Sequence, residues 1–448
     1  MKKALLAILV LALGSLVTSA QSIVKESPLG AYGAMHWTLS NGINVYVKAS
    51  KLQPGWLTIA GTSPGGYSHN YTPAQASSLK QLNTVMAVSG AGGMTAVELG
   101  KMLRADSARM RTYVERDEEG FAGSCKRTGL ETALKVLQLK ALHPQIDTAA
   151  VNKYVAVNKK ANAKHGDPKF AFADSIFANV FGHHPVGSEK VSNYDLDHID
   201  LDFILQVYQD RFADLSDMSV FVVGDFDPDS LKTLVVKYIA TLPGKGRVEK
   251  PVDIGYRLFD SSKTLRFTAK MAEPQDKVYF FWTTQVDYTL KNYLTAQVAG
   301  RILSDMWLDD LRGKHGWTKH IDSHCSVVDT DGGPAIYFPF NATVTAGKGE
   351  AARQLVLDDL ERVARGNVTA AQLKTQQDYY SRVHKENMGT NGYWMQMLQN
   401  YVLNDGLDFD GPYQSTLESI TRADVAAFVA RLLNKGRQLN LMMTPAQD

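Results

Sequence analysis

The sequence groups its metal-binding side chains most densely between His315 and Cys325, where His320, Asp322 and His324 also lie. Imidazole, carboxylate and thiolate are the groups that zinc prefers. The pattern predicts that this segment continues as a strand, with His320, Asp322 and His324 on one face. At ~3.3 Å per residue the two outer histidines would be ~13 Å apart, too far to share one ion. We therefore interpret them as histidines of a half-exposed strand, and a zinc site on an adjacent pair is the alternative.

Three other motifs could do chemistry, and each has a structural explanation. His183 and His184 look like a ligand pair, but neighbouring side chains point apart. The glycine-rich residues 89–93 lack the Gly-Lys-Ser/Thr that reaches phosphate, which predicts a loop between helices. Cys125 shares a predicted strand face with Phe121 and has no histidine near it in sequence, which favours a buried apolar role over that of a nucleophile.

The composition is that of an ordinary globular protein. The chain has 448 residues, of which 44% are hydrophobic and 21% charged. These values exclude a disordered, collagen-like or coiled-coil protein. The chain has 48 basic residues (Lys and Arg) and 46 acidic residues (Asp and Glu). Removal of Lys2 and Lys3 with a leader would leave 46 basic and 46 acidic residues. This balance argues against a nucleic-acid binder, and two cysteines cannot form a disulfide framework.

Residues 1–20 have the three-part pattern of a secretory signal: two lysines, an apolar run, and small residues that end at Ala20. The apolar run is shorter than the ~20 residues that a membrane span needs. A retained anchor is therefore the less favoured alternative. We expect cleavage before Gln21 and a soluble protein in an exported compartment, most simply the periplasm of a Gram-negative bacterium.

The chain contains a long internal duplication. Residues 199–212 match residues 420–433 without a gap, and the strand-like residues 220–222 match 441–443 at the same offset of 221. Upstream, two helices are expected to begin at Asp147 and Thr369, which are plausible N-caps 222 residues apart. Spacings repeated at this scale predict two similar α+β domains.

Predicted hairpins and a segment rich in proline and glycine indicate where these domains begin and end. A first hairpin is predicted over residues 37–48, and a second has its turn at 115–120. Residues 329–333 take the matching place in the second half, and 220–223 form a central strand. The breaker-rich residues 243–251 lie where the repeat restarts. The predicted limits are 1–20 for the signal peptide, 21–245 for the first domain and 250–448 for the second.

An ordered set of motifs then resembles a known family. The motifs are residues 181–187, 197–200, 208–212, 222–227, 237–243 and 311–316. Their succession resembles the pitrilysin/insulinase metallopeptidase family, which includes mitochondrial processing peptidase. The resemblance implies two homologous α+β domains of that type, each an antiparallel-rich sheet packed with helices. It also implies that two such halves close as a clamshell around an unfolded peptide.

The chemistry of that family is missing from this sequence. Active members bind zinc through an inverted His-x-x-Glu-His helix and a distal glutamate, and the glutamate between the histidines acts as the general base. None of the eleven histidines is followed by Glu-His at that spacing. The corresponding helix, residues 73–89, has no His, Glu or Asp, and the helix of the distal ligand, 148–164, has no Glu. We therefore assign no catalytic or metal-binding residue, and expect zinc only in a partner subunit.

The resemblance also implies that the second domain offers an arginine and a tyrosine to the substrate. Arg312 keeps the arginine, while Lys319 stands where the tyrosine is expected. An ammonium can donate a hydrogen bond to a peptide carbonyl as a phenol does. Arg312 and Lys319 are thus the predicted substrate-binding residues, and two solvated charges at a helix end are the alternative.

Three functions compete at this point. The first is an exported, non-catalytic half, a pseudoenzyme that forms a heterodimer with a zinc-bearing partner half, or pairs with a second copy, and helps form a peptide-binding chamber in proteolysis. The second is a structural scaffold in a larger complex. The third is an active zinc metallopeptidase with an atypical metal site. The first predicts that the inner sheet edge accepts an extended peptide by strand addition.

Overall fold

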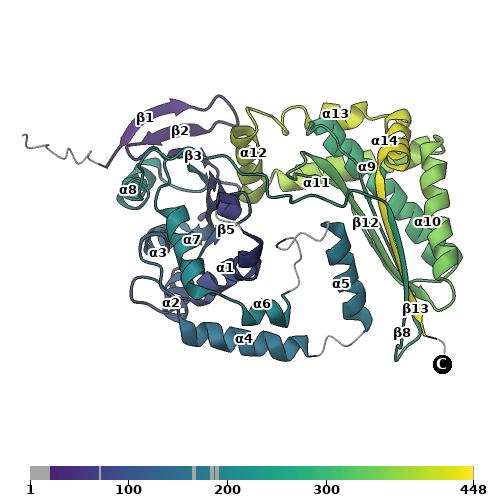
Figure 1. The fold of residues 1–448 in the computed structure, drawn as a ribbon. Coiled ribbons are helices and arrows are strands. Elements are labelled where there is room, and N and C mark those ends of the chain that lie inside the picture. The colour runs from purple at the N-terminus through teal and green to yellow at the C-terminus, as the bar shows by residue number, and fades with distance from the viewer. Residues whose placement is uncertain (1–20, 70–71, 164–167, 182–185, 187–190, 447–448) are drawn as a thin grey trace, which may run out of the picture.

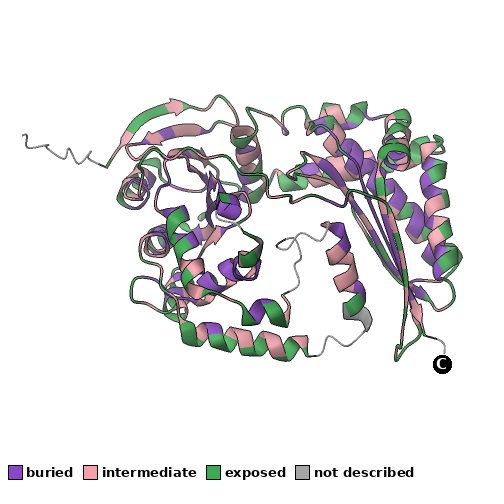
Figure 2. Ribbon diagram, in the orientation of Figure 1, coloured by how far each residue is buried: buried purple, intermediate pink, exposed green. Residues whose placement is uncertain are grey.

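The computed structural model describes residues 21–446, except 70–71, 164–167, 182–185 and 187–190. The predicted signal peptide and His183–His184 therefore lie outside the described residues. The fold is α+β, with two sheets that pack against helices (Figure 1), as predicted. The sides of strands and helices that face one another are buried (Figure 2). The described part of the chain contains no helix long and apolar enough to cross a membrane.

The first sheet has seven strands in the order β1-β2-β3-β7-β4-β6-β5. Its centre is β7, which runs parallel to β3 and antiparallel to β4. All four residues from Val220 to Val223 are buried, as expected for a central strand. The strands are β1 (Ile23–Pro28), β2 (Met35–Leu39), β3 (Asn44–Ala49), β4 (Trp56–Pro64), β5 (Ala108–Val114), β6 (Glu118–Lys126) and β7 (Ser219–Gly224).

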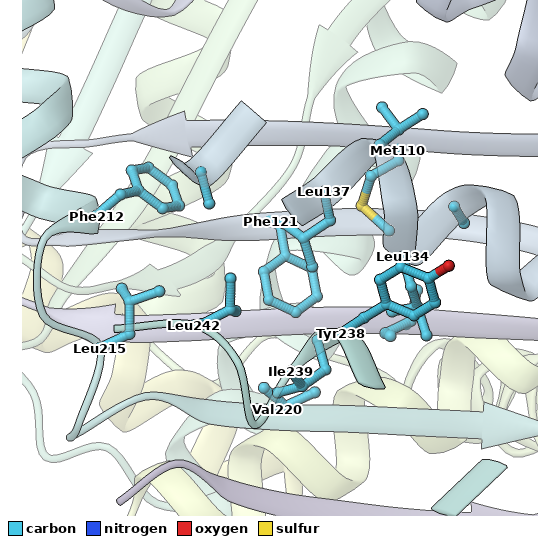
Figure 3. Packing of buried hydrophobic residues seen from close by; sticks show 14 of the residues in the cluster. Met110, Phe121, Leu134, Leu137, Phe212, Leu215, Val220, Tyr238, Ile239 and Leu242 are labelled. Carbon is cyan, nitrogen blue, oxygen red and sulfur yellow. The ribbon is translucent and has the colours of Figure 1, made fainter. Parts of the chain in front are cut away.

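Helices cover one face of this sheet and complete a hydrophobic core. Figure 3 shows part of it, where Met110 of β5 lies among buried side chains that include Phe121, Leu134 and Leu137. The helices of this part of the chain are α1 (Ala76–Val88), α2 (Ala96–Ala105), α3 (Leu130–Leu142), α4 (Thr148–Asn162), α5 (Pro168–Val180), α6 (Asn193–Asp197), α7 (Leu201–Phe212) and α8 (Pro228–Tyr238).

The second sheet repeats the order of five strands of the first, β5-β6-β4-β7-β3. Its strands run β10-β12-β9-β13-β8, and β11 also pairs with β12. β8 is parallel to β13, as β3 is to β7, and the remaining pairs are antiparallel in both sheets. The strands are β8 (Lys263–Ala269), β9 (Gln275–Thr283), β10 (Ile321–Ser323), β11 (Ser326–Val328), β12 (Ala335–Thr345) and β13 (Arg437–Pro445). The helices are α9 (Leu290–Leu308), α10 (Gly349–Ala364), α11 (Ala370–Asn387), α12 (Asn391–Leu403), α13 (Tyr413–Ser419) and α14 (Arg422–Lys435).

Each half places one helix on the sheet of the other half (Figure 1). Phe172 and Val180 of α5 pack in one cluster with Leu439 and Leu441 of β13. In return, α12 packs through residues such as Leu398 on the first sheet. The two helices hold equivalent positions, α5 between α4 and α6, and α12 between α11 and α13. The domain limits 21–245 and 250–448 therefore remain predictions, because each part of the chain packs one helix on the sheet of the other part.

Local signals in the sequence were reliable. Asp147, Asp227 and Thr369 cap α4, α8 and α11, and each accepts a hydrogen bond from the backbone N–H of the third residue of its helix. The predicted turn after Val114 is tighter than expected, because β6 already begins at Glu118. Short-range chemistry thus sets where the elements begin.

Candidate functional site

Helix α1 presents three polar residues on one face. Lys80, Asn83 and Thr84 have the spacing i, i+3, i+4, which brings side chains together on a helix surface. A His-x-x-Glu-His motif on this helix would need the same spacing. The apolar residues of α1 point into the core instead.

Two of the three residues meet side chains of neighbouring helices. The Nζ of Lys80 lies 3.4 Å from Oδ2 of Asp195 in α6, and this pair is mostly buried. Thr84 forms a hydrogen bond with Tyr154 of α4, whose hydroxyl also donates to Oε1 of Gln81 at 2.5 Å. Burial raises the pKa of Tyr154 above its usual value. The ammonium of Lys80 thus pairs with α6, while the phenol of Tyr154 in α4 meets the hydroxyl of Thr84 and the amide of Gln81.

This set of groups does not fit zinc. Protein zinc sites use imidazole, thiolate or carboxylate ligands, and a charged ammonium cannot coordinate a cation. The carboxylate of Asp195 is held by Lys80 and by the hydroxyl of Ser77. Across the part of the chain that the structure describes, no group of three or more His, Cys, Asp or Glu side chains is placed to hold a metal ion.

Asn83 contacts the edge of the first sheet. Its Oδ1 accepts the backbone N–H of Val114 at 2.9 Å, and its Nδ2 donates to the carbonyl of Val114 at 3.1 Å. The same Nδ2 lies 3.0 Å from Oε1 of Glu115, whose pKa is raised by burial. A side-chain amide thus satisfies both backbone groups of Val114, as the peptide group of a neighbouring strand would.

The rest of β5 is an open edge. β5 is the last strand of its sheet and, among the residues that the structure describes, pairs only with β6. Ser107 and Glu115, at the two ends of the pairing, form their backbone hydrogen bonds with the β6 side. Because the bonding direction alternates along a strand, the N–H and C=O groups of Met110 and Thr112 point away from β6. Their side chains point into the core, where the hydroxyl of Tyr208 donates to Thr112 at 2.8 Å.

A cavity of about 540 Å³ lies at the corresponding edge of the second sheet. Its floor is the polar face of β12, and its rim is the segment before β10. Side chains that can bond to a peptide line it: Gln275, Trp317, Lys319, His320, Asp322, Asn341 and Thr343. This set offers both donors and acceptors in one place.

The two predicted substrate contacts are separated in the structure. Lys319 lines the cavity, whereas the exposed Arg312 lies outside its lining, on the π-helical turn Asp309–Lys314 that follows α9. His320 and Asp322 also line the cavity, but His324 lies against the ring of Tyr337. The predicted strand over 320–324 is shorter than expected, because β10 spans only Ile321–Ser323.

Two minor interpretations are confirmed. Residues 89–93 form the connection between α1 and α2. Cys125 is fully buried and burial raises its pKa to about 12, so its thiol is held in the unreactive protonated form. The open edge of β5 and the contact of Asn83 with Val114 were not found from the sequence. In the sequence, Asn83 is one of several polar residues of α1, and nothing marks it as a contact of β5.

Comparisons with known proteins agree with this architecture. A family model described as "Peptidase M16 inactive domain" matches residues 198–380. The probable zinc protease PqqL of Haemophilus influenzae is 22% identical over 214 residues, which are 47% of this chain and 22% of that protein. The periplasmic protease PqqL from Escherichia coli has a similar structure, with a TM-score of 0.79 and 16% identity over 96% of this chain and 47% of that one.

Two other solved structures show the same fold. A mutant of the ferredoxin protease FusC, in complex with Arabidopsis ferredoxin, has a TM-score of 0.78 and 16% identity, and the match covers 100% of this chain and 48% of that one. A protease from Helicobacter pylori has a TM-score of 0.72 and 16% identity, covering 92% of this chain and 99% of that one. The chain therefore spans about half the length of the PqqL and FusC chains. Residues 198–380 of this chain therefore match the inactive domain of the M16 peptidases, the fold is that of solved M16-like proteases, and the sequence lacks the His-x-x-Glu-His motif.

Proposed function

We propose that this chain is a non-catalytic peptidase-family half that pairs with a zinc-bearing partner half and supplies a peptide-binding wall of the proteolytic chamber. The open edge of β5 carries this proposal. Asn83 already binds Val114 there through one donor and one acceptor, so the edge has the geometry that a neighbouring peptide group needs. An extended peptide would continue this pairing along Thr112 and Met110.

Pairing and export rest on separate observations. The match to about half of each PqqL and FusC chain supports the idea that this chain takes the place of one half of a larger enzyme. The set of Lys80, Thr84 and Tyr154 between α1 and α4 supports a partner as the source of zinc. The signal-like residues 1–20 support export, and the periplasm is the simplest destination.

Thr112 allows a direct test, because its N–H points away from β6. Thr112→Pro removes this donor without removing a bond of the β5–β6 ladder, since proline is tolerated at the free side of an edge strand. Thr112→Val is the matched control: it loses the same hydroxyl bond to Tyr208 but keeps the N–H. Binding of a fluorescent, unstructured ten-residue Thr/Val peptide to each variant is measured by anisotropy.

We expect the proline variant to bind the peptide about fivefold more weakly, which corresponds to one lost hydrogen bond, and the valine variant to match the wild type. Equal affinities of the two variants would contradict strand addition at β5. No peptide binding by any form, together with stable incorporation into a complex without peptidase activity, would favour the scaffold function instead.

A further inference from the structure

The open edge of β5 carries two arginines without an ionic partner. Arg109 and Arg111 are exposed on the face opposite the core, and neither forms an ion pair with a residue that the structure describes. Arg111 lies over the ring of Tyr113, 5.1 Å from its centroid. These side chains stand on the same face of the strand, two residues apart.

The residues of the neighbouring strand that lie directly opposite them are not acidic. Arg109 lies opposite Ser124 of β6, and Arg111 lies opposite Ala122. Arg111 interacts electrostatically with the carboxylate of Glu115, which lies in the turn after β5. That carboxylate accepts a hydrogen bond from Asn83. Because β6 presents small residues opposite both arginines, their guanidinium groups are accessible to carboxylates that approach from the open side of β5.

The pairing geometry fixes where such partners would stand. Met110 and Thr112 turn their backbone groups outward, so an added antiparallel strand would form its hydrogen-bonded pairs with them. Arg109 and Arg111 would then occupy the positions between, where side chains of opposite residues lie closest. Residues of the added strand that face the two arginines are separated by one residue, which pairs with Met110.

We propose that this edge selects extended polypeptides with carboxylates at alternate positions, in the pattern acid-x-acid. The inference rests on the proposed function, because it needs a peptide strand on β5. The acidic side chains would lie opposite Arg111 and Arg109. The intervening side chain would point to the other face of the sheet.

The test uses two peptides of identical composition in a Thr/Val background. One has two glutamates separated by a single residue, and the other has two adjacent glutamates, so that only one of them can face the arginines. Each is titrated by fluorescence anisotropy against the wild type and Arg109→Gln/Arg111→Gln. The matched control is Lys101→Gln/Arg104→Gln, which removes the same charge from exposed positions of the adjacent helix α2.

We expect the alternating peptide to bind the wild type about fivefold more tightly than the adjacent isomer, with the preference shrinking at high salt. The preference should vanish in Arg109→Gln/Arg111→Gln and persist in the control. Equal binding of both peptides to the wild type, with Thr112→Pro still weakening both, would overturn the acidic pattern and leave strand addition standing. Loss of the Thr112→Pro effect as well would show that the proposed function itself is wrong.

Discussion

Arg116, in the turn between β5 and β6, forms an ion pair with Asp331, in the turn between β11 and β12. The two turns occupy matching places in the repeated halves, so the pair joins the halves tip to tip. The Asp331 carboxylate also accepts the backbone N–H groups of Ile254 and Tyr256, at 3.2 and 2.7 Å. The guanidinium of Arg116 lies over the ring of Tyr256, 4.6 Å from its centroid. This cluster fixes the end of the β5 edge relative to the second sheet.

Asp331→Asn should therefore destabilise the protein. It removes the buried carboxylate that pairs with Arg116 and leaves only the more exposed Asp117 as its charged partner, so we expect the free energy of unfolding to fall by about 2 kcal/mol. Urea denaturation measures this change. Asp329→Asn, at an exposed position of the same turn, is the control and should stay close to wild type. Equal losses in both variants would show that the ion pair is not the cause.

Glu119 should make stability depend on pH. Burial raises its pKa to about 8, against the hydrogen bond from the Gly66 N–H and the charges of Arg211 and Arg247, which lower it. The folded state therefore binds this proton more tightly than the unfolded chain does. The contribution of Glu119 to stability is present below pH 4.5 and is lost as the pH rises through about 8.

Glu119→Gln should flatten this dependence, because glutamine cannot ionise. Melting temperatures of both forms between about pH 5 and pH 9 test it. The wild type should lose stability across this range relative to the variant. Glu361→Gln, a surface substitution, should follow the wild type. Parallel curves for wild type and Glu119→Gln would contradict the prediction.

The purified wild-type chain should contain far less than one zinc per molecule, since the groups between α1 and α4 do not fit the metal. The combination Lys80→His, Asn83→Glu, Thr84→His and Tyr154→Glu places the missing ligand types on that face and should raise the content to about one zinc per chain. Elemental analysis of both proteins checks this. Stoichiometric zinc in the wild type would contradict the non-catalytic proposal, and the segment from His315 to Cys325 would then be the first to mutate.

Lys319 should matter more for peptide affinity than Arg312. Lys319 lines the cavity beside β12, and Lys319→Gln should weaken binding of the Thr/Val peptide by about threefold. Arg312→Gln should have a smaller effect, because Arg312 lies outside the lining of this cavity. Anisotropy titrations compare the two variants. A larger loss for Arg312→Gln would point to a peptide path along the π-helical turn.

The sequence by itself determined the elements, their order and the missing chemistry. Helix caps such as Asp147 and Thr369 act on backbone groups three residues away, so a local pattern suffices to place them. The repeat at an offset of 221 predicted two similar α+β domains, and the lack of Glu-His at the required spacing after any histidine was visible without coordinates.

Only the tertiary structure decided how these elements meet. An apolar stripe shows that a helix face is buried but not which sheet buries it, so the exchange of α5 and α12 between the two sheets was hidden. The hydrogen bonds between Asn83 and Val114, 31 residues apart, were also hidden, as was the ion pair between Arg116 and Asp331, 215 residues apart. These contacts depend on the three-dimensional path of the chain. The type of a polar residue does not reveal which distant residue it will contact.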